Sequence, residues 1–161
     1  MDEEWKQTLD DFSRIWPRVV GSVPPPSPPR DAPEELAALI RRETAARRRY
    51  QAMAGETKGT NAAAWARLAA GSRRLIRKLQ TEYYLRSGDS CPVPYQPVQN
   101  YGSEEEFYSR AWLDAGQAER AYLEAAGRSE DAVLLAVFAE AAGQKRRQCE
   151  ELRALCEQMF R

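Results

Sequence analysis

The sequence predicts an all-α protein: a four-helix bundle of two α-hairpins joined by a long crossover, with an extra N-terminal helix and a proline-rich linker before it. Alanine and arginine are abundant and β-branched residues are few, which favours helix over strand. Apolar side chains recur at helical spacing in four long stretches, and glycine and proline gather between those stretches, where they end helices. We therefore divide the chain into an N-terminal segment, residues 1–30, and a bundle, residues 31–161.

The N-terminal segment combines a short amphipathic stretch with a stiff linker. Large apolar residues between positions 2 and 16 recur at helical spacing and form one stripe: Trp5, Leu9, Phe12 and Trp16. Six prolines follow between positions 17 and 29, which predicts an extended linker. We expect the helix to lie across the bundle surface, and a detachable helix that binds another protein is the alternative.

The first hairpin is expected to hold helices over residues 31–55 and 62–86. Asp31 and Glu34 have the spacing of a capping box, and Gly55 is expected to end the first helix. The inner face of the first helix carries Leu36, Ile40, Glu43, Ala46, Tyr50 and Met53. The inner face of the second helix carries Trp65, Leu68, Ser72, Leu75, Leu79 and Tyr83.

The second hairpin follows an irregular connection, residues 89–102, whose length suits a crossover between helices that are not antiparallel neighbours. Ser103 and Glu106 form a second capping box at the start of the third helix. The inner face of that helix carries Phe107, Ala111, Ala115, Ala118 and Tyr122. The last helix runs to the end of the chain and places two long polar side chains, Lys145 and Gln148, within its apolar stripe.

The two hairpins have similar sequences, which indicates an internal repeat. Tyr50 and Tyr122 close the inner faces of the first and third helices, and an Ala-Ala-Gly step lies within the second and fourth. In addition, Glu43 stands seven residues before Tyr50. Together with the crossover and the helix lengths, these features make residues 33–160 resemble the ferritin-like superfamily, and within it the rubrerythrin-like bacterial proteins.

The resemblance implies a di-iron centre, with a Glu seven residues before a Tyr on the first and third helices and Glu-x-x-His on the other two. The positions that correspond to these ligands, here vestigial metal-site positions, are Glu43, Ser72, Leu75, Ala115, Lys145 and Gln148. Only Glu43 retains the family's residue, the chain contains no histidine, and a shifted register at Gln144 and Arg147 recovers no ligand. We therefore expect a degenerate di-iron site with no catalytic residue, no metal and no cofactor.

A solitary carboxylate on an inner face is unfavourable unless it has a partner. We hypothesise that the Lys145 ammonium stands where a metal ion stood and forms a buried pair with Glu43, while Ser72 and Gln148 supply further hydrogen bonds. The alternative is a rotated last helix in which Lys145 extends to solvent.

The remaining polar and sulfur-containing residues are assigned structural roles. Cys149 and Cys156 are separated by a helical rise of about 10 Å, too far for a disulfide between them. We interpret the three cysteines as core thiols, with a reactive or intermolecular role for Cys91 as the alternative. The arginine clusters are interpreted as solvated helix faces with salt bridges.

These observations favour a non-catalytic role. Lys+Arg and Asp+Glu balance at 24 each, so we expect no nucleic acid and no membrane partner, and the few cysteines favour the cytoplasm. The favoured function is a pseudo-rubrerythrin bundle with a structural or protein-interaction role, bound to an unknown protein partner or forming a homodimer. One alternative is a ferritin- or rubrerythrin-type oxidoreductase that holds iron or manganese with Glu43 and Asp114 or Glu119. Another is a binding module that uses the N-terminal helix or the arginine faces.

Overall fold

The computed structural model describes residues 31–98 and 102–159, and these residues form four long α-helices. The helices are α2 (Ala32–Glu56), α3 (Gly59–Ser87), α4 (Glu104–Arg128) and α5 (Ala132–Met159). Within the described ranges there is no β-strand, so the predicted all-α four-helix bundle is confirmed. The expected helix over residues 2–16 and the proline-rich linker lie outside the described residues.

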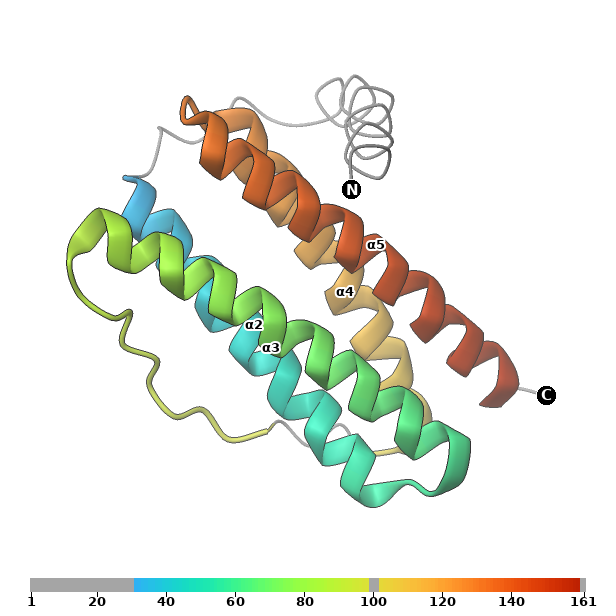
Figure 1. Ribbon diagram of the computed structural model, residues 1–161. Coiled ribbons are helices and arrows are strands. Elements are labelled where there is room, and N and C mark those ends of the chain that lie inside the picture. The colour runs from blue at the N-terminus through green and yellow to red at the C-terminus, as the bar shows by residue number, and fades with distance from the viewer. Residues whose placement is uncertain (1–30, 99–101, 160–161) are drawn as a thin grey trace.

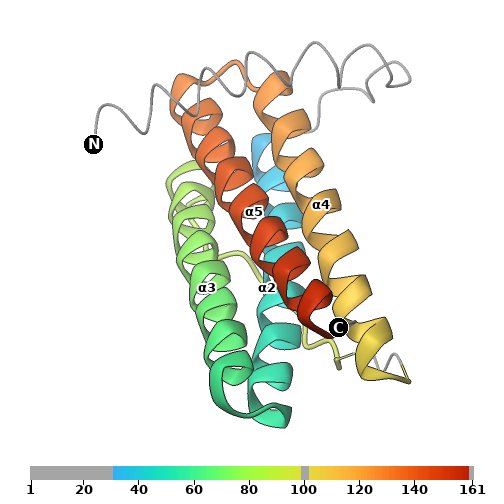
Figure 2. The ribbon, with the colours of Figure 1, turned by 90° about the vertical axis from the view of Figure 1, so that its right-hand side faces the viewer.

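The four helices form two antiparallel hairpins (Figure 1). α2 packs along α3 and α4 packs along α5, while α2 also lies beside α4 and α3 beside α5 (Figure 2). The connection after α3 runs back along the length of the bundle, so α4 begins at the end where α2 finishes. α2 and α5 therefore stand at diagonally opposite corners. None of the described helices has the length and apolar character that crossing a lipid bilayer requires.

The helix ends agree with the sequence at one predicted cap and differ at another. The Ser103 hydroxyl accepts a hydrogen bond from the Glu106 amide at 3.2 Å, as the capping box predicts. The Asp31 side chain makes no such bond, so the first capping box is wrong. The turn between α2 and α3 is also shorter than expected, because both the amide and the hydroxyl of Thr57 bond to the Met53 carbonyl and carry α2 on to Glu56.

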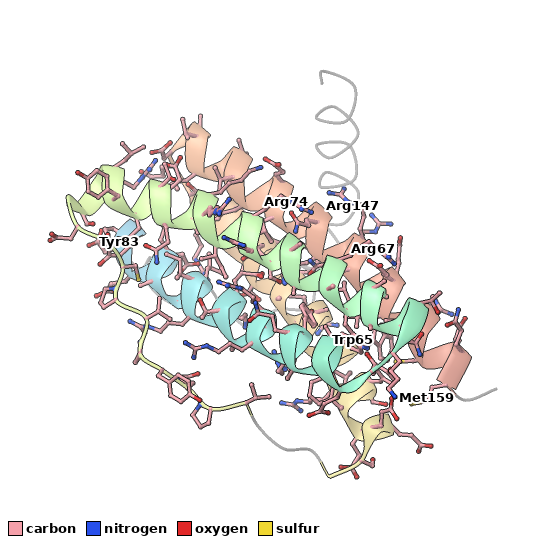
Figure 3. The ribbon with its side chains drawn as sticks, turned by 60° about the horizontal axis from the view of Figure 1, so that its bottom comes forward. Trp65, Arg67, Arg74, Tyr83, Arg147 and Met159 are labelled. Carbon is pink, nitrogen blue, oxygen red and sulfur yellow. The ribbon has the colours of Figure 1, made fainter. Side chains whose placement is uncertain are left out.

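The apolar core consists of two clusters, one toward each end of the bundle. Leu36, Ile40, Leu79 and Phe138 belong to the cluster at the end where α2 begins. The other cluster centres on the buried Trp65, whose ring stacks on Tyr108 with a centroid distance of 5.0 Å. Figure 3 shows Trp65 at this second end, close to the start of α4. Buried polar side chains lie between the two clusters.

We expect the Ser103 cap to contribute measurably to stability. Ser103→Ala removes the acceptor of the Glu106 amide and should lower the free energy of unfolding by about 1 kcal/mol. Asp31→Ala is the matched control and should cost less, because its side chain makes no cap hydrogen bond. Denaturant unfolding at high salt, which screens helix-dipole effects, measures both values, and equal losses would contradict this assignment.

Candidate functional site

The bundle centre contains a buried polar layer with residues from all four helices. Glu43 of α2 and Lys145 of α5 are 0% and 1% exposed, and Lys145 Nζ lies 2.8 Å from Glu43 Oε1. The structure therefore brings the proposed buried pair together across the diagonal of the bundle. The alternative, with Lys145 extending to solvent, is not the arrangement found.

Two further polar groups complete the pair. The Tyr122 hydroxyl of α4 donates a hydrogen bond to Glu43 Oε1 at 2.9 Å. Lys145 Nζ donates to Gln148 Oε1 at 3.0 Å, one helical turn further along α5, and lies 6.0 Å from the centre of the Tyr50 ring. A buried ion pair is stable only when additional hydrogen bonds satisfy its remaining polar atoms. Here each charged group has one neutral hydrogen-bond partner besides its opposite charge.

The structure buries every vestigial metal-site position and both inner-face tyrosines: Glu43, Tyr50, Ser72, Leu75, Ala115, Tyr122, Lys145 and Gln148. The expected hydrogen bond from Ser72 is wrong, because its Oγ atom has no hydrogen-bond partner among the described residues. Glu43 Oε2 also lacks one. The reason is that Tyr122 and Lys145 both approach the Oε1 atom of Glu43, and neither reaches Ser72.

The inward register of α5 is set by how closely it approaches α3. A Cβ atom on Gly71 of α3 would lie 2.7 Å from Gln148 Nε2 and 2.9 Å from Gln144 Nε2, so the missing side chain makes room for both amides. Lys145 and Gln148 are buried, whereas Arg147 lies on the exposed side of α5 (Figure 3). The alternative register, which would point Gln144 and Arg147 inward in place of Lys145 and Gln148, is therefore not the one found.

The two acids considered as additional metal ligands have other surroundings. Asp114 forms ion pairs with Arg49 and Arg110 on the side of α4 that faces a cavity. Burial raises the pKa of Glu119, and the nearby Arg146 and Arg120 act in the opposite direction. Within the described residues, no three His, Cys, Asp or Glu side chains gather as a metal site requires.

The cysteines differ from the expected pattern in their burial. Cys91, the candidate reactive thiol, is 5% exposed, and the Gln80 side chain bonds to both its amide and its carbonyl. Cys149 and Cys156 are only half-buried, so the core-thiol interpretation is incomplete for these two. Burial raises the pKa of all three thiols, which lowers their reactivity as nucleophiles at neutral pH.

The interpretation of every arginine cluster as a solvated face misses one feature. Arg41, Arg42, Arg48 and Arg49 of α2 line a single cavity, and Arg110 of α4 joins them. The spacing of the four α2 arginines, two pairs about two turns apart, is the sequence signal that could have placed them on one side of the helix.

Comparisons of the chain with models of protein families, with curated proteins and with solved structures find no match. The ferritin-like assignment made from the sequence therefore stays a prediction.

We expect the central ion pair to be strongly coupled. Lys145→Met leaves the Glu43 carboxylate buried beside an apolar group and should lower the free energy of unfolding by about 3–5 kcal/mol. Glu43→Leu combined with Lys145→Met removes both charges and should recover much of the lost free energy of unfolding. The recovery should be incomplete, because Tyr122 and Gln148 lose their hydrogen-bond partners. Urea unfolding of the three proteins measures these differences.

The exposed pair between Lys78 of α3 and Glu140 of α5, which likewise joins the two hairpins, supplies the control. Lys78→Met should cost no more than about 1 kcal/mol, because solvent screens this pair. If Lys145→Met and the double variant were equally unstable, Glu43 and Lys145 would not be energetically coupled.

We also expect stability to fall at alkaline pH. Burial, the charge of Glu43 and the hydrogen bond to it raise the pKa of the Tyr122 hydroxyl well above its usual value. The native state then retains a proton that the unfolded chain releases, so stability is lost as pH rises above about 10. In Tyr122→Phe the decline in unfolding free energy between pH 9 and 11 should be shallower, and identical slopes would refute this.

Proposed function

We propose that this protein is a ferritin-like, rubrerythrin-related bundle that has exchanged its di-iron centre for an internal ion pair and acts as a non-catalytic structural or protein-interaction module. The observation that carries the proposal is the 2.8 Å contact between Lys145 Nζ and Glu43 Oε1 at the bundle centre. The ammonium group supplies the positive charge that metal ions supply in the family.

The helix arrangement supports the family assignment. Ferritin-like proteins have one long crossover between two hairpins, and the connection after α3 runs the length of this bundle in the same way (Figure 1). The corresponding positions on α2, α3, α4 and α5 all lie in or beside one buried layer.

The donor atoms in that layer do not fit a di-iron centre. Two irons require several carboxylates to neutralise and bridge them, together with imidazoles. The layer offers the Glu43 carboxylate, a serine hydroxyl, an amide and two phenols. Lys145, a cation, stands 2.8 Å from the only carboxylate of this set, where a metal ion would have to bind. We therefore derive no iron chemistry for this site.

Apolar side chains on the surface support an interaction role. Trp112 and Leu113 of α4 are 40% and 50% exposed. Leu85 and Val133 are also exposed at the other end of the bundle, where Arg86 bridges α3 to Asp131. We take these exposed apolar side chains as the candidate contacts for another protein or a second copy of the chain.

The test is the metal content of the full-length protein expressed in medium rich in iron and manganese. We expect far less than one metal ion per chain after desalting and no visible absorption from an iron centre. Lys145→Glu is the matched variant, because it replaces the ammonium with a second carboxylate and should retain more metal than the parent if it folds. Near-stoichiometric metal in the parent protein would refute the proposal.

A further inference from the structure

A cavity of about 410 Å³ opens between α2 and α4, where residues 96–98 of the connection also line it. Its lining includes five guanidinium groups and one ammonium: Arg41, Arg42, Arg48, Arg49, Arg110 and Lys145. Asp114 is the only acidic residue among the described residues that line it. Glu43 neutralises Lys145, so the excess of positive charge in the cavity comes from the arginines.

One carboxylate is shared between two of these arginines. Asp114 forms an ion pair with Arg49 from α2, and Arg110 Nε lies 3.3 Å from its other oxygen. The single negative charge of Asp114 therefore neutralises at most one of the two guanidinium groups.

The other guanidinium groups have neutral partners or none. Arg42 donates to the Gln117 carbonyl at 3.1 Å, and Arg48 donates to the Gln96 carbonyl at 3.1 Å. Arg41 forms no hydrogen bond or ion pair with another described residue. Each guanidinium group has five N–H donors, so most donors around the cavity stay available to a ligand.

The hollow exists because the facing side chains are small. Ala45 and Ala46 of α2 face Ala115 and Ala118 of α4, and the floor is formed by Tyr50 and Lys145.

The basic residues on the opposite side of the bundle differ from these. Arg67 pairs with Glu151 and Lys78 with Glu140 along the line where α3 and α5 meet, so carboxylates of α5 neutralise residues of α3. Figure 3 shows Arg67, Arg74 and Arg147 along this line. Two basic residues on this line therefore have carboxylate partners of their own, whereas the five arginines of the cavity have Asp114 alone among the described lining residues.

We propose that this cavity binds a small soluble molecule that carries a phosphate group. A phosphate dianion presents several oxygens that accept paired hydrogen bonds from guanidinium groups. A ligand with a phosphate group therefore matches several arginines around one cavity better than a ligand with a single carboxylate does. The volume lies within the range of small-molecule sites, and the alanines provide the apolar part of the lining. This inference is independent of the family assignment.

The experiment measures thermal stability and calorimetric binding of the full-length protein with inorganic pyrophosphate, at ionic strength held constant with sodium chloride. Pyrophosphate should raise the melting temperature, because a ligand that binds the folded state stabilises it. Arg41→Gln combined with Arg48→Gln should weaken binding by at least about tenfold. Asp114→Asn should strengthen binding, because it releases Arg49 and Arg110.

Arg73→Gln combined with Arg77→Gln, on the exposed face of α3, removes the same charge away from the cavity and should leave binding unchanged. The proposal is overturned if pyrophosphate stabilises no more than chloride, or if the α3 variant loses as much affinity as the cavity variant. It is also overturned if succinate binds more tightly, or if the protein binds only phosphatidate-containing vesicles or single-stranded oligonucleotides and not pyrophosphate.

Discussion

The ion pair between Glu43 and Lys145 joins the two hairpins at the centre of the bundle, and the rest of the structure is arranged around it. Each charge would be unfavourable alone at this buried position, so each depends on the other remaining in place. Because α2 and α5 stand at opposite corners, only long side chains can meet between them. The pair therefore restricts the rotation of both helices, and Tyr122 adds α4 to the same contact.

The same polar layer divides the core and leaves space at one side. Apolar clusters pack above and below it, so hydrophobic burial stabilises each end while the layer specifies how the ends align. Alanines at the α2–α4 contact are compatible with this packing, but they do not fill the space between the helices. The cavity is thus a consequence of small residues beside a fixed central pair, and its floor includes Lys145 itself.

Charge balance over the whole chain conceals this local excess. The chain has 24 basic and 24 acidic residues, yet the described residues that line the cavity include five arginines and a single acid. Electrostatic interactions weaken within about 10 Å in physiological salt, so the local arrangement decides what binds there. The net charge of the chain indicates whether polyanions are attracted from a distance. It gives no information about the local charge of a cavity that is lined by residues from only one side of α2 and one side of α4.

The sequence by itself determined the four helices, the Ser103 cap and the inward faces that hold Glu43 and Lys145, because helical periodicity assigns each residue to a face. Tertiary structure decided between the Glu43–Lys145 pair and a solvent-directed Lys145, and it alone paired Asp114 with Arg49 and left Ser72 without a hydrogen-bond partner among the described residues. The reason is geometric. One residue of register turns a helix face by about 100°, and the packing of all four helices, through contacts such as Gly71 against Gln148, fixes that angle.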